Sequence, residues 1–265
     1  MRLIVTRPQR EALLWQAELQ ARGHQAWVLP LIDVGPVADT AALRLAWQQL
    51  PQYQAMMLVS ANAVHNFFQE NWHVDPVNIA STAPKLRVWA TGPGTVAALL
   101  AAGVARHSID APAPDTVQFD SEALWQGVAQ QVQPGSRVLI VRGADSPGLS
   151  SAGPGLGRDW LAQQLSQAGA SVQTCVAYQR AAPAFTAAQL AQARQAASDG
   201  ACWVFSSSEA VHNLCAALPQ QDWSAARAVA THRRIAQAAR AAGFGVVCES
   251  RATLADVLAS IESMA

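Results

Sequence analysis

The sequence predicts an α/β protein of two similar domains, each a parallel sheet flanked by helices. Three observations predict it: a duplication along the chain, apolar runs that alternate with amphipathic stretches, and the continuous apolar character of those runs. Strands that alternate with helices are typical of parallel sheets covered on both faces. Strands buried on both faces are apolar throughout, rather than at every second residue.

The duplication begins with a strand, a helix and a second strand. Residues 3–7 (Leu-Ile-Val-Thr-Arg) resemble residues 139–143 (Leu-Ile-Val-Arg-Gly). A helix follows each, closed by Gly23 or Gly169, because glycine readily adopts the left-handed conformation that ends a helix. Apolar residues at helical spacing line one face of each helix: Ala12, Trp15 and Leu19, then Leu161, Leu165 and Ala168. The second strand is expected over 26–31 and over 172–178.

The duplication continues through two further strand–helix units. Residues 56–60 match 202–207, and Ala-Val-His-Asn at 63–66 recurs unchanged at 210–213. Residues 88–91 match 228–231, and Gly103 and Gly243 end the helices that follow. The repeats therefore span about 1–130 and 135–265. The pattern leaves open whether each repeat forms its own domain or the two exchange halves.

Composition favours a globular protein that binds neither nucleic acid nor a membrane. Apolar residues make up 51% of the 265 residues and charged residues 14%, with a formal net charge of zero. No basic excess is available for nucleic acid. The first apolar run is too short for a signal peptide or a membrane span, so we expect a cytoplasmic protein. Four cysteines at spacings that fit no zinc motif predict buried, reduced thiols: Cys175, Cys202, Cys215 and Cys248.

Small hydroxyl residues follow the predicted strands at one end. In open parallel sheets, ligands bind beyond the carboxyl ends of the strands. Each hydroxyl taken alone is more typical of a helix N-cap, and residues 206–209 have the form of a capping box. Together with the free N–H groups of helix N-termini, however, they predict an anion-binding cradle. The residues are Thr6, Ser60, Thr91, Ser206, Ser207, Ser208 and Thr231.

Several common enzyme motifs are absent from the sequence. The loop 91–95 (Thr-Gly-Pro-Gly-Thr) lacks the Lys of a Walker motif, and no G-x-G-x-x-G follows the first strand. No Ser–His–Asp order or H-E-x-x-H argues for a hydrolase, and the repeat-equivalent His65 and His212 are typical of structural helix positions. The glycine-rich stretch 148–157 has no counterpart in the first repeat, which indicates an insertion; whether it acts as a lid stays open.

An ordered set of short motifs resembles the uroporphyrinogen-III synthase family over nearly the whole chain. The motifs are Val-Thr-Arg-Pro at 5–8, Pro-Leu-Ile at 30–32, Ser-x-Asn-Ala-Val at 60–64, Gly-Pro-Gly-Thr at 92–95, Leu-Ile-Val-Arg-Gly at 139–143, Gly-Arg-Asp at 157–159 and Tyr-Gln-Arg at 178–180. Each motif is weak alone, but their order is that of the family.

The resemblance implies two α/β domains with exchanged halves and a two-stranded connector. One domain would be residues 1–35 plus 179–265, and the other residues 36–178. The connector strands would lie around 31–36 and 176–182. A connector this thin predicts motion between the domains.

The resemblance also implies a reaction. The substrate would be hydroxymethylbilane, a linear tetrapyrrole with acetate and propionate arms, closed to uroporphyrinogen III with ring D inverted and water lost. Such an enzyme is a lyase of haem and sirohaem biosynthesis and needs no cofactor or metal. Tyr178 would be catalytic, donating a proton or hydrogen bond to the departing hydroxyl; a packing role for the same side chain stays open.

The resemblance places substrate-binding groups at the strand ends of both repeats. The implied residues are Thr6, Arg7, Ser60, Asn62, Thr91, Gly92, Gly94, Thr95, Arg142, Gly143, Ser206, Ser207 and Thr231. Arg158 and Arg180 are either further contacts or surface charges. The second repeat departs from the family's Gly-Pro-Thr-type loop, since residues 231–234 are Thr-His-Arg-Arg. That departure weakens the case for Thr231, although two arginines there suit an anionic substrate.

Two other functions fit the same architecture. One is an α/β transferase that binds phosphate at the strand ends, which should show an acidic metal site or a base-stacking aromatic near Gly92; the sequence shows neither. The other is a two-domain protein that binds small anions without turnover. We expect a monomer whose partner is its small-molecule substrate. The sequence leaves open whether product passes directly to a neighbouring pathway enzyme.

Overall fold

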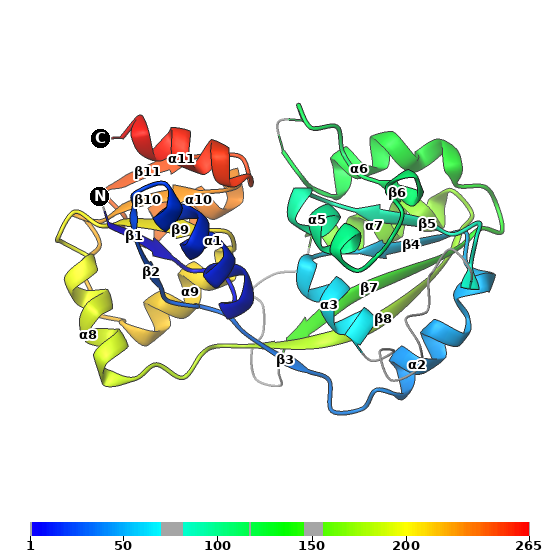
Figure 1. Ribbon diagram of the computed structural model, residues 1–265, viewed down its shortest axis with the longest axis horizontal. Helices are drawn as coiled ribbons and strands as arrows, with labels where there is room; N and C mark the ends of the chain where they lie inside the picture. The colour runs from blue at the N-terminus through cyan, green and yellow to red at the C-terminus, as the bar shows by residue number, and fades with distance from the viewer. Residues whose placement is uncertain (1, 70–81, 117, 146–155, 265) are drawn as a thin grey trace. The chain divides into compact units, whose positions relative to one another are not determined.

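The computed structural model describes residues 2–69, 82–116, 118–145 and 156–264. The chain forms two compact units (Figure 1). Unit 1 contains Met1–Asp33 and Ala181–Ala265, and unit 2 contains Val34–Arg180. Each crossing between the units lies two residues from the domain boundary that the resemblance implied, at 33/34 rather than 35/36 and at 180/181 rather than 178/179.

Unit 1 is a five-stranded parallel sheet in the order β11-β10-β9-β1-β2. In chain order this is 2-1-3-4-5, one of the two common orders of doubly wound folds. The strands are β1 (Arg2–Val5), β2 (Gln25–Val28), β9 (Cys202–Phe205), β10 (Arg227–Ala230) and β11 (Val246–Glu249). The helices are α1 (Gln9–Ala21), α8 (Ala187–Ala196), α9 (Ser208–Ala217), α10 (Arg233–Ala241) and α11 (Leu254–Glu262).

Successive strand residues of unit 1 alternate between two cores. On one face Leu3 and Val204 pack with Leu19 of α1 and Val257 of α11. On the other face, aromatic rings pack edge-to-face and stacked at 5.1–6.3 Å between centroids: Trp203, Phe205, Trp223 and Phe244. Continuous apolar strands are needed because both faces are covered, as the sequence predicted.

Unit 2 is a six-stranded sheet in the order β3-β8-β7-β4-β5-β6. The strands are β3 (Asp33–Pro36), β4 (Ala55–Leu58), β5 (Arg87–Ala90), β6 (Ile109–Asp110), β7 (Arg137–Asp145) and β8 (Ser171–Ala181). The helices are α2 (Ala41–Gln48), α3 (Ala61–Gln69), α5 (Pro93–Ala101), α6 (Ser121–Val128) and α7 (Leu156–Gln167). Pairs from β8 through β6 are parallel.

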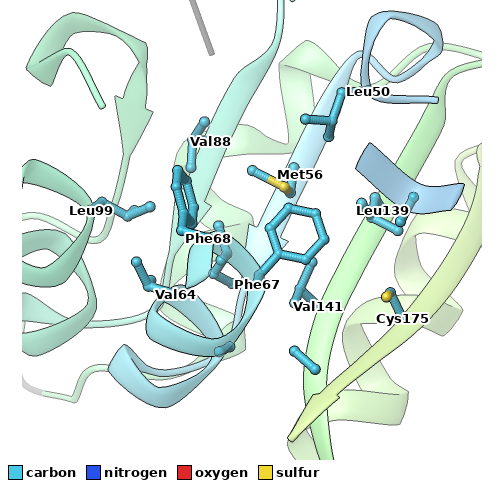
Figure 2. Packing of buried hydrophobic residues seen from close by; sticks show 14 of the residues in the cluster. Leu50, Met56, Val64, Phe67, Phe68, Val88, Leu99, Leu139, Val141 and Cys175 are labelled. Atoms are coloured by element: carbon cyan, nitrogen blue, oxygen red, sulfur yellow. The ribbon is translucent and has the colours of Figure 1, made fainter. Parts of the chain in front are cut away.

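The cores of unit 2 also lie on both faces of its sheet. Met56, Val88 and Leu139 point toward one face, where Phe67 and Leu99 pack against them (Figure 2). The next residue of each strand points toward the other face, where Met57, Trp89 and Ile140 pack with Leu124 of α6 and Leu161 of α7. This alternation is the period of two expected of strands.

The two sequence repeats exchange halves, as the resemblance implied. The first two strands of repeat one join the last three strands of repeat two in the sheet of unit 1. Unit 2 takes the complementary halves, and β3 lies next to β8 in its sheet. Strand β8 extends to Ala181, beyond the predicted end at Tyr178, while β2 ends at Val28, short of Leu31. Residues 33–36 form a separate strand, β3, which is the neighbour of β8 in the sheet of unit 2.

Glycine ends the first helix of each repeat. Gly23 and Gly169 both adopt φ +82°, so a side chain there would strain the backbone. Leu161 and Leu165 are fully buried. Ala168 lies beyond the end of α7 and is only half-buried, because the helix stops one residue earlier than the apolar spacing suggested.

The cysteines differ from the prediction in part. Cys175 and Cys202 are buried, but Cys215 and Cys248 are half-exposed, since they lie on α9 and on the edge strand β11. In the part of the chain that the structure describes, no helix is long and apolar enough to cross a membrane. Most of the glycine-rich stretch 148–157 lies outside the described residues.

Candidate active site

Several of the predicted site residues lie at the same height at the carboxyl edge of the unit 2 sheet. Leu58 of β4 pairs with Ala90 of β5 and with Val141 of β7. The following residues, Thr91 and Arg142, therefore lie at the same height, although β7 itself continues to Asp145. Ser60 follows two residues after the end of β4, at the start of α3.

A hydroxyl pair joins two residues that the sequence placed 118 positions apart. Ser60 Oγ and Tyr178 Oη lie 3.0 Å apart and form a hydrogen bond. Ser60 Oγ also accepts a hydrogen bond from the Ala63 N–H at 3.1 Å, so it caps the first turn of α3. Tyr178 is buried, with 4% of its surface exposed, whereas Ser60 is half-buried. The same Ser60 oxygen thus caps α3 and forms the hydrogen bond with Tyr178.

Gly143 makes room for the Tyr178 ring. A Cβ on Gly143 would lie 2.5 Å from Cε2 and Cζ of Tyr178, closer than any real contact. The register between β7 and β8 shifts at this point, so that Arg142 pairs with Val176 and Gly143 with Tyr178. Such an irregularity re-aims a side chain. The structure therefore supplies a packing reason for Gly143, whose contact with substrate stays a prediction.

The loop after β5 leads directly into helix α5. Gly92 is the N-cap of α5, and its carbonyl accepts from the N–H groups of Thr95 and Val96, each at 3.1 Å. The Thr91 hydroxyl donates to the Val59 carbonyl at 3.5 Å, and Thr95 is buried. Apart from its chain neighbours and the backbone of α5, no atom of a described residue lies within 4 Å of a Cβ built on Gly94, so the space over this turn is open.

Asn62 lies in the first turn of α3. Its carbonyl accepts a hydrogen bond from the Asn66 side chain at 2.9 Å, one helical turn further on. The side chain of Asn62 is half-buried beside the Ser60 cap. Arg180 lies near the end of β8 and is half-buried. The side chain of Arg158 lies outside the described residues.

The corresponding edge of unit 1 is more highly charged. Thr6 is buried and donates its hydroxyl to the Val204 carbonyl at 2.7 Å, which ties β1 to β9. The Arg7 guanidinium lies 4.0 Å from the centroid of the Trp15 ring and 3.4 Å from the Glu11 carboxylate. Burial lowers the pKa of Arg7 from its ordinary value, and Glu11 acts in the opposite direction.

The N-termini of α9 and α10 also lie at the carboxyl edge of the unit 1 sheet. Ser207 caps α9 by accepting from the Glu209 N–H at 3.2 Å, and Ser206 is half-buried just before it. The cap is thus Ser207 and not Ser206, the residue that the capping-box pattern indicated. His232 caps α10, with Nδ1 accepting from the Arg234 N–H at 3.1 Å. Thr231 is buried at the end of β10.

The strand registers show which residues occupy equivalent positions in the two units, and they do so more accurately than the sequence comparison. Strands β4 and β9 begin 147 residues apart, so Ser60 corresponds to Ser207, and both cap a helix. The pairings Val5–Val204 and Leu58–Val141 make Arg7 the counterpart of Arg142. The sequence comparison had set Arg7 against Gly143, because a run of apolar residues matches equally well after a slip of one position.

Sequence reasoning missed three side chains at these edges. Glu11 and Trp15 hold the Arg7 guanidinium from the first two turns of α1, and His232 replaces a small hydroxyl residue as an N-cap. The spacing 7, 11, 15 could have indicated the first two, because residues four apart lie on one helix face. Within the described ranges, no group of three or more His, Cys, Asp or Glu side chains is placed to hold a metal ion.

The fold and its edges define a class of protein. Each unit presents hydroxyls, helix N-termini and an arginine at the carboxyl edge of a doubly wound sheet, an arrangement typical of enzymes that bind anionic small molecules. The family model described as uroporphyrinogen-III synthase HemD matches residues 14–259. The chain therefore belongs to the uroporphyrinogen-III synthase family, a family of enzymes.

Curated relatives and solved structures agree with that family. The chain is 30% identical over 256 residues to the uroporphyrinogen-III synthase of Salmonella typhimurium, covering 92% of each. It is 27% identical over 251 residues to that of Escherichia coli, again covering 92% of each. A Helicobacter pylori uroporphyrinogen-III synthetase structure is similar at TM-score 0.57 and 13% identity, covering 100% of both chains. A Thermus thermophilus synthase structure is similar at TM-score 0.55 and 15% identity, covering 99% and 98%.

Proposed function

We propose that the chain is a cyclising lyase that converts hydroxymethylbilane to uroporphyrinogen III with inversion of ring D and loss of water. The family match supports the overall function. One structural observation supports the site: the Ser60–Tyr178 hydroxyl pair at the carboxyl edge of the unit 2 sheet. The family match does not favour a phosphate-binding transferase or a binding protein without turnover.

The reaction requires little from the protein except position and a hydrogen-bond donor. The C–O bond of the hydroxymethyl group breaks, the oxygen takes up a proton and leaves as water, and an electrophilic methylene-pyrrole remains. Attack by the substituted carbon of ring D gives a spiro intermediate. The bond from that carbon to the methylene bridge of ring C then breaks, the freed methylene forms a bond to the unsubstituted α carbon of ring D, and loss of the proton from that carbon leaves ring D inverted. Holding a flexible chain in one geometry supplies several kcal/mol of the barrier reduction, on the order of 7 or more in favourable cases.

Ser60 is the hydroxyl that we assign to the departing group. Its oxygen accepts from the Ala63 N–H and lies within hydrogen-bond distance of Tyr178, so with Tyr178 as donor its own hydrogen is free to point outward. Tyr178 is buried and therefore acts through Ser60. In this arrangement Ser60 O–H donates to the leaving oxygen, while the phenol of Tyr178 fixes the direction of that donation.

The anionic arms of the substrate would be held by arginines and helix N-termini. Arg7 and Arg142 are equivalent positions on the two edges, and Arg233 and Arg234 are exposed in the first turn of α10. A cation in the first turn of a helix opposes the helix dipole, so two of them there cost stability. A binding role for a polycarboxylate supplies the physical reason for keeping them.

The proposal extends to the setting of the reaction. We place the enzyme in the cytoplasm as a cofactor-independent monomer within tetrapyrrole biosynthesis. Its partner is the small-molecule substrate, with transient contact to the enzymes before and after it in the pathway. Gel filtration at micromolar concentration checks the monomer, and cross-linking in cell extract checks the contacts.

An isomer assay tests the function. Hydroxymethylbilane is generated in situ, the purified chain is added, and the oxidised products are separated into uroporphyrins I and III. We expect isomer III to predominate, in proportion to enzyme concentration, because unassisted closure gives isomer I. Isomer I alone, formed at the uncatalysed rate by a sample with a cooperative melting transition, would rule the proposal out.

A further inference from the structure

A small cavity opens at the amino-terminal edge of the unit 2 sheet. It has a volume of about 170 Å³ and is formed around the beginnings of β4, β5 and β7. Ala55, Val132 and Val138 contribute apolar surface, together with the ring of Trp89. The polar residues of the wall are Gln54, Lys85, Arg87, Gln131 and Ser136.

The side-chain oxygens of this wall already accept hydrogen bonds from the protein. Gln54 Oε1 accepts from the Arg137 N–H, and Ser136 Oγ accepts from the Gln133 N–H at 3.0 Å. Gln131 Oε1 accepts from the indole N–H of Trp89 at 3.4 Å. The polar groups of these three side chains that can still bind a ligand are donors: the carboxamide NH₂ groups of Gln54 and Gln131 and the hydroxyl of Ser136.

The cavity also carries one uncompensated positive charge. Arg87 is neutralised by Asp110, which accepts from its Nε at 2.9 Å and from NH2 at 2.5 Å. Lys85, the only lysine of the chain, is exposed and forms no ion pair with a described residue. Among the described residues, no acidic side chain lines the cavity. Donors around a single free ammonium suit a monoanion whose oxygens are acceptors only.

We propose that this cavity binds a small organic acid through its carboxylate. The carboxylate would meet Lys85, Ser136 and the carboxamides, while a short hydrocarbon part would lie against Trp89 and the valines. The volume equals that of several waters, at about 30 Å³ each in the liquid, so it accommodates an acid of a few carbons.

This cavity is separate from the candidate active site. Ser60 and Thr91 follow the carboxyl ends of β4 and β5, and Arg142 lies in the second half of β7, whereas the cavity lies at the amino ends of these strands. A strand of four residues spans roughly 13 Å, so a ligand at one edge does not touch groups at the other. The inference therefore does not depend on the proposed reaction.

A titration of the full chain with sodium butyrate tests the inference. The Trp89 indole N–H signal, assigned in an ¹H–¹⁵N spectrum by comparison with Trp89→Phe, reports on the cavity through its bond to Gln131. We expect a saturable shift with a dissociation constant on the order of millimolar, as suits so few atoms. Sodium chloride at equal ionic strength should leave that signal unchanged.

Matched variants identify the carboxylate partner. Lys85→Gln should weaken butyrate binding about tenfold, and Lys85→Arg should bind within about threefold of the wild type. Arg10→Gln removes an exposed charge from unit 1 and should change nothing. Absence of saturation, a chloride response equal to that of butyrate, or unaltered binding by Lys85→Gln would each overturn the proposal. Tighter binding of inorganic phosphate than of butyrate would overturn the assignment to an organic acid.

Discussion

The two units present the same framework with different chemistry at the edge. Ser60 and Ser207 are equivalent caps, but Ser60 also binds the phenol of Tyr178. The helix after β5 in unit 2 begins with Gly-Pro-Gly, and the helix after β10 in unit 1 begins with His-Arg-Arg. We infer a division of work between the duplicated edges: the unit 2 edge supplies the neutral hydroxyls for bond breaking, and the unit 1 edge supplies most of the charge for the carboxylates.

The largest expected effect is a fall in kcat when the unit 2 hydroxyl pair, Ser60 and Tyr178, is altered. Ser60→Ala should lower kcat about 100-fold, because it removes the donor to the departing oxygen. Tyr178→Phe should lower kcat about tenfold, because Ser60 keeps its hydrogen but loses its orientation. Kinetics of isomer III formation measure both changes.

The matched change in unit 1 sharpens the comparison. Ser207→Ala should raise KM and leave kcat within about threefold, while lowering the free energy of unfolding by about 1 kcal/mol through loss of the cap. A fall in kcat for Ser207→Ala as large as that for Ser60→Ala would contradict the division of work.

Gly143→Ala should destabilise unit 2 by about 2 kcal/mol, because the added methyl group overlaps the Tyr178 ring. It should also reduce kcat, since the ring must shift away from Ser60. Gly127→Ala is the control: this glycine lies in α6 with open space around it, and alanine there should be neutral or stabilising. Thermal unfolding followed by circular dichroism measures the pair.

Removing both cations from the first turn of α10 should weaken substrate binding and stabilise the folded protein. Arg233→Ala with Arg234→Ala should raise KM about tenfold and raise the free energy of unfolding by roughly 0.5 kcal/mol, since the helix dipole no longer opposes them. Arg240→Ala, at the other end of the helix where Arg240 pairs with Glu249 at 3.0 Å, should lower stability and leave KM unchanged. An unaltered KM in the double variant would show that these charges do not serve the substrate.

The smallest effect concerns the buried thiols. Burial raises the pKa of Cys202 to about 12 and that of Cys175 to about 11. Each thiol holds its proton more tightly in the folded chain, so its contribution to stability is complete below pH ~8.5 and declines as pH rises toward those values. Urea unfolding between pH 8 and 11 should show the decline, and Cys202→Ala should reduce it more than Cys175→Ala. Equal profiles for all three proteins would contradict this account.

Much of the fold could be predicted because burial on both faces leaves a clear pattern. Strands such as β4 and β9 are apolar throughout, and Gly23 and Gly169 mark the helix ends by a conformation that other residues rarely adopt. Exchange of the repeats' halves could not come from pattern, since both pairings bury the same residues; the family resemblance supplied it. The one-residue slip between Arg7 and Arg142 has a similar cause.

The site could be predicted only as a set of strand ends. The Ser60–Tyr178 contact depends on the β7–β8 register shift and on the missing side chain of Gly143, neither of which leaves a local signal. The hydroxyl of Thr6 donates to the Val204 carbonyl, because a buried polar group needs a partner, and its contact with substrate stays a prediction. Contact of the remaining strand-end residues with substrate stays a prediction.

The exchange of halves also fixes an order of events during synthesis. Strand β1 lies inside the unit 1 sheet between β2 and β9, but β9 leaves the ribosome only after all of unit 2 has done so. Unit 2 is continuous in sequence, so it can fold while the chain is still growing. The first 33 residues must wait, with the apolar face of β1 uncovered, until residues 181 onward arrive. A nascent chain stalled within unit 2 would therefore expose one hydrophobic segment, the strand–helix–strand unit of the first 33 residues. A chaperone could bind the nascent chain at this segment.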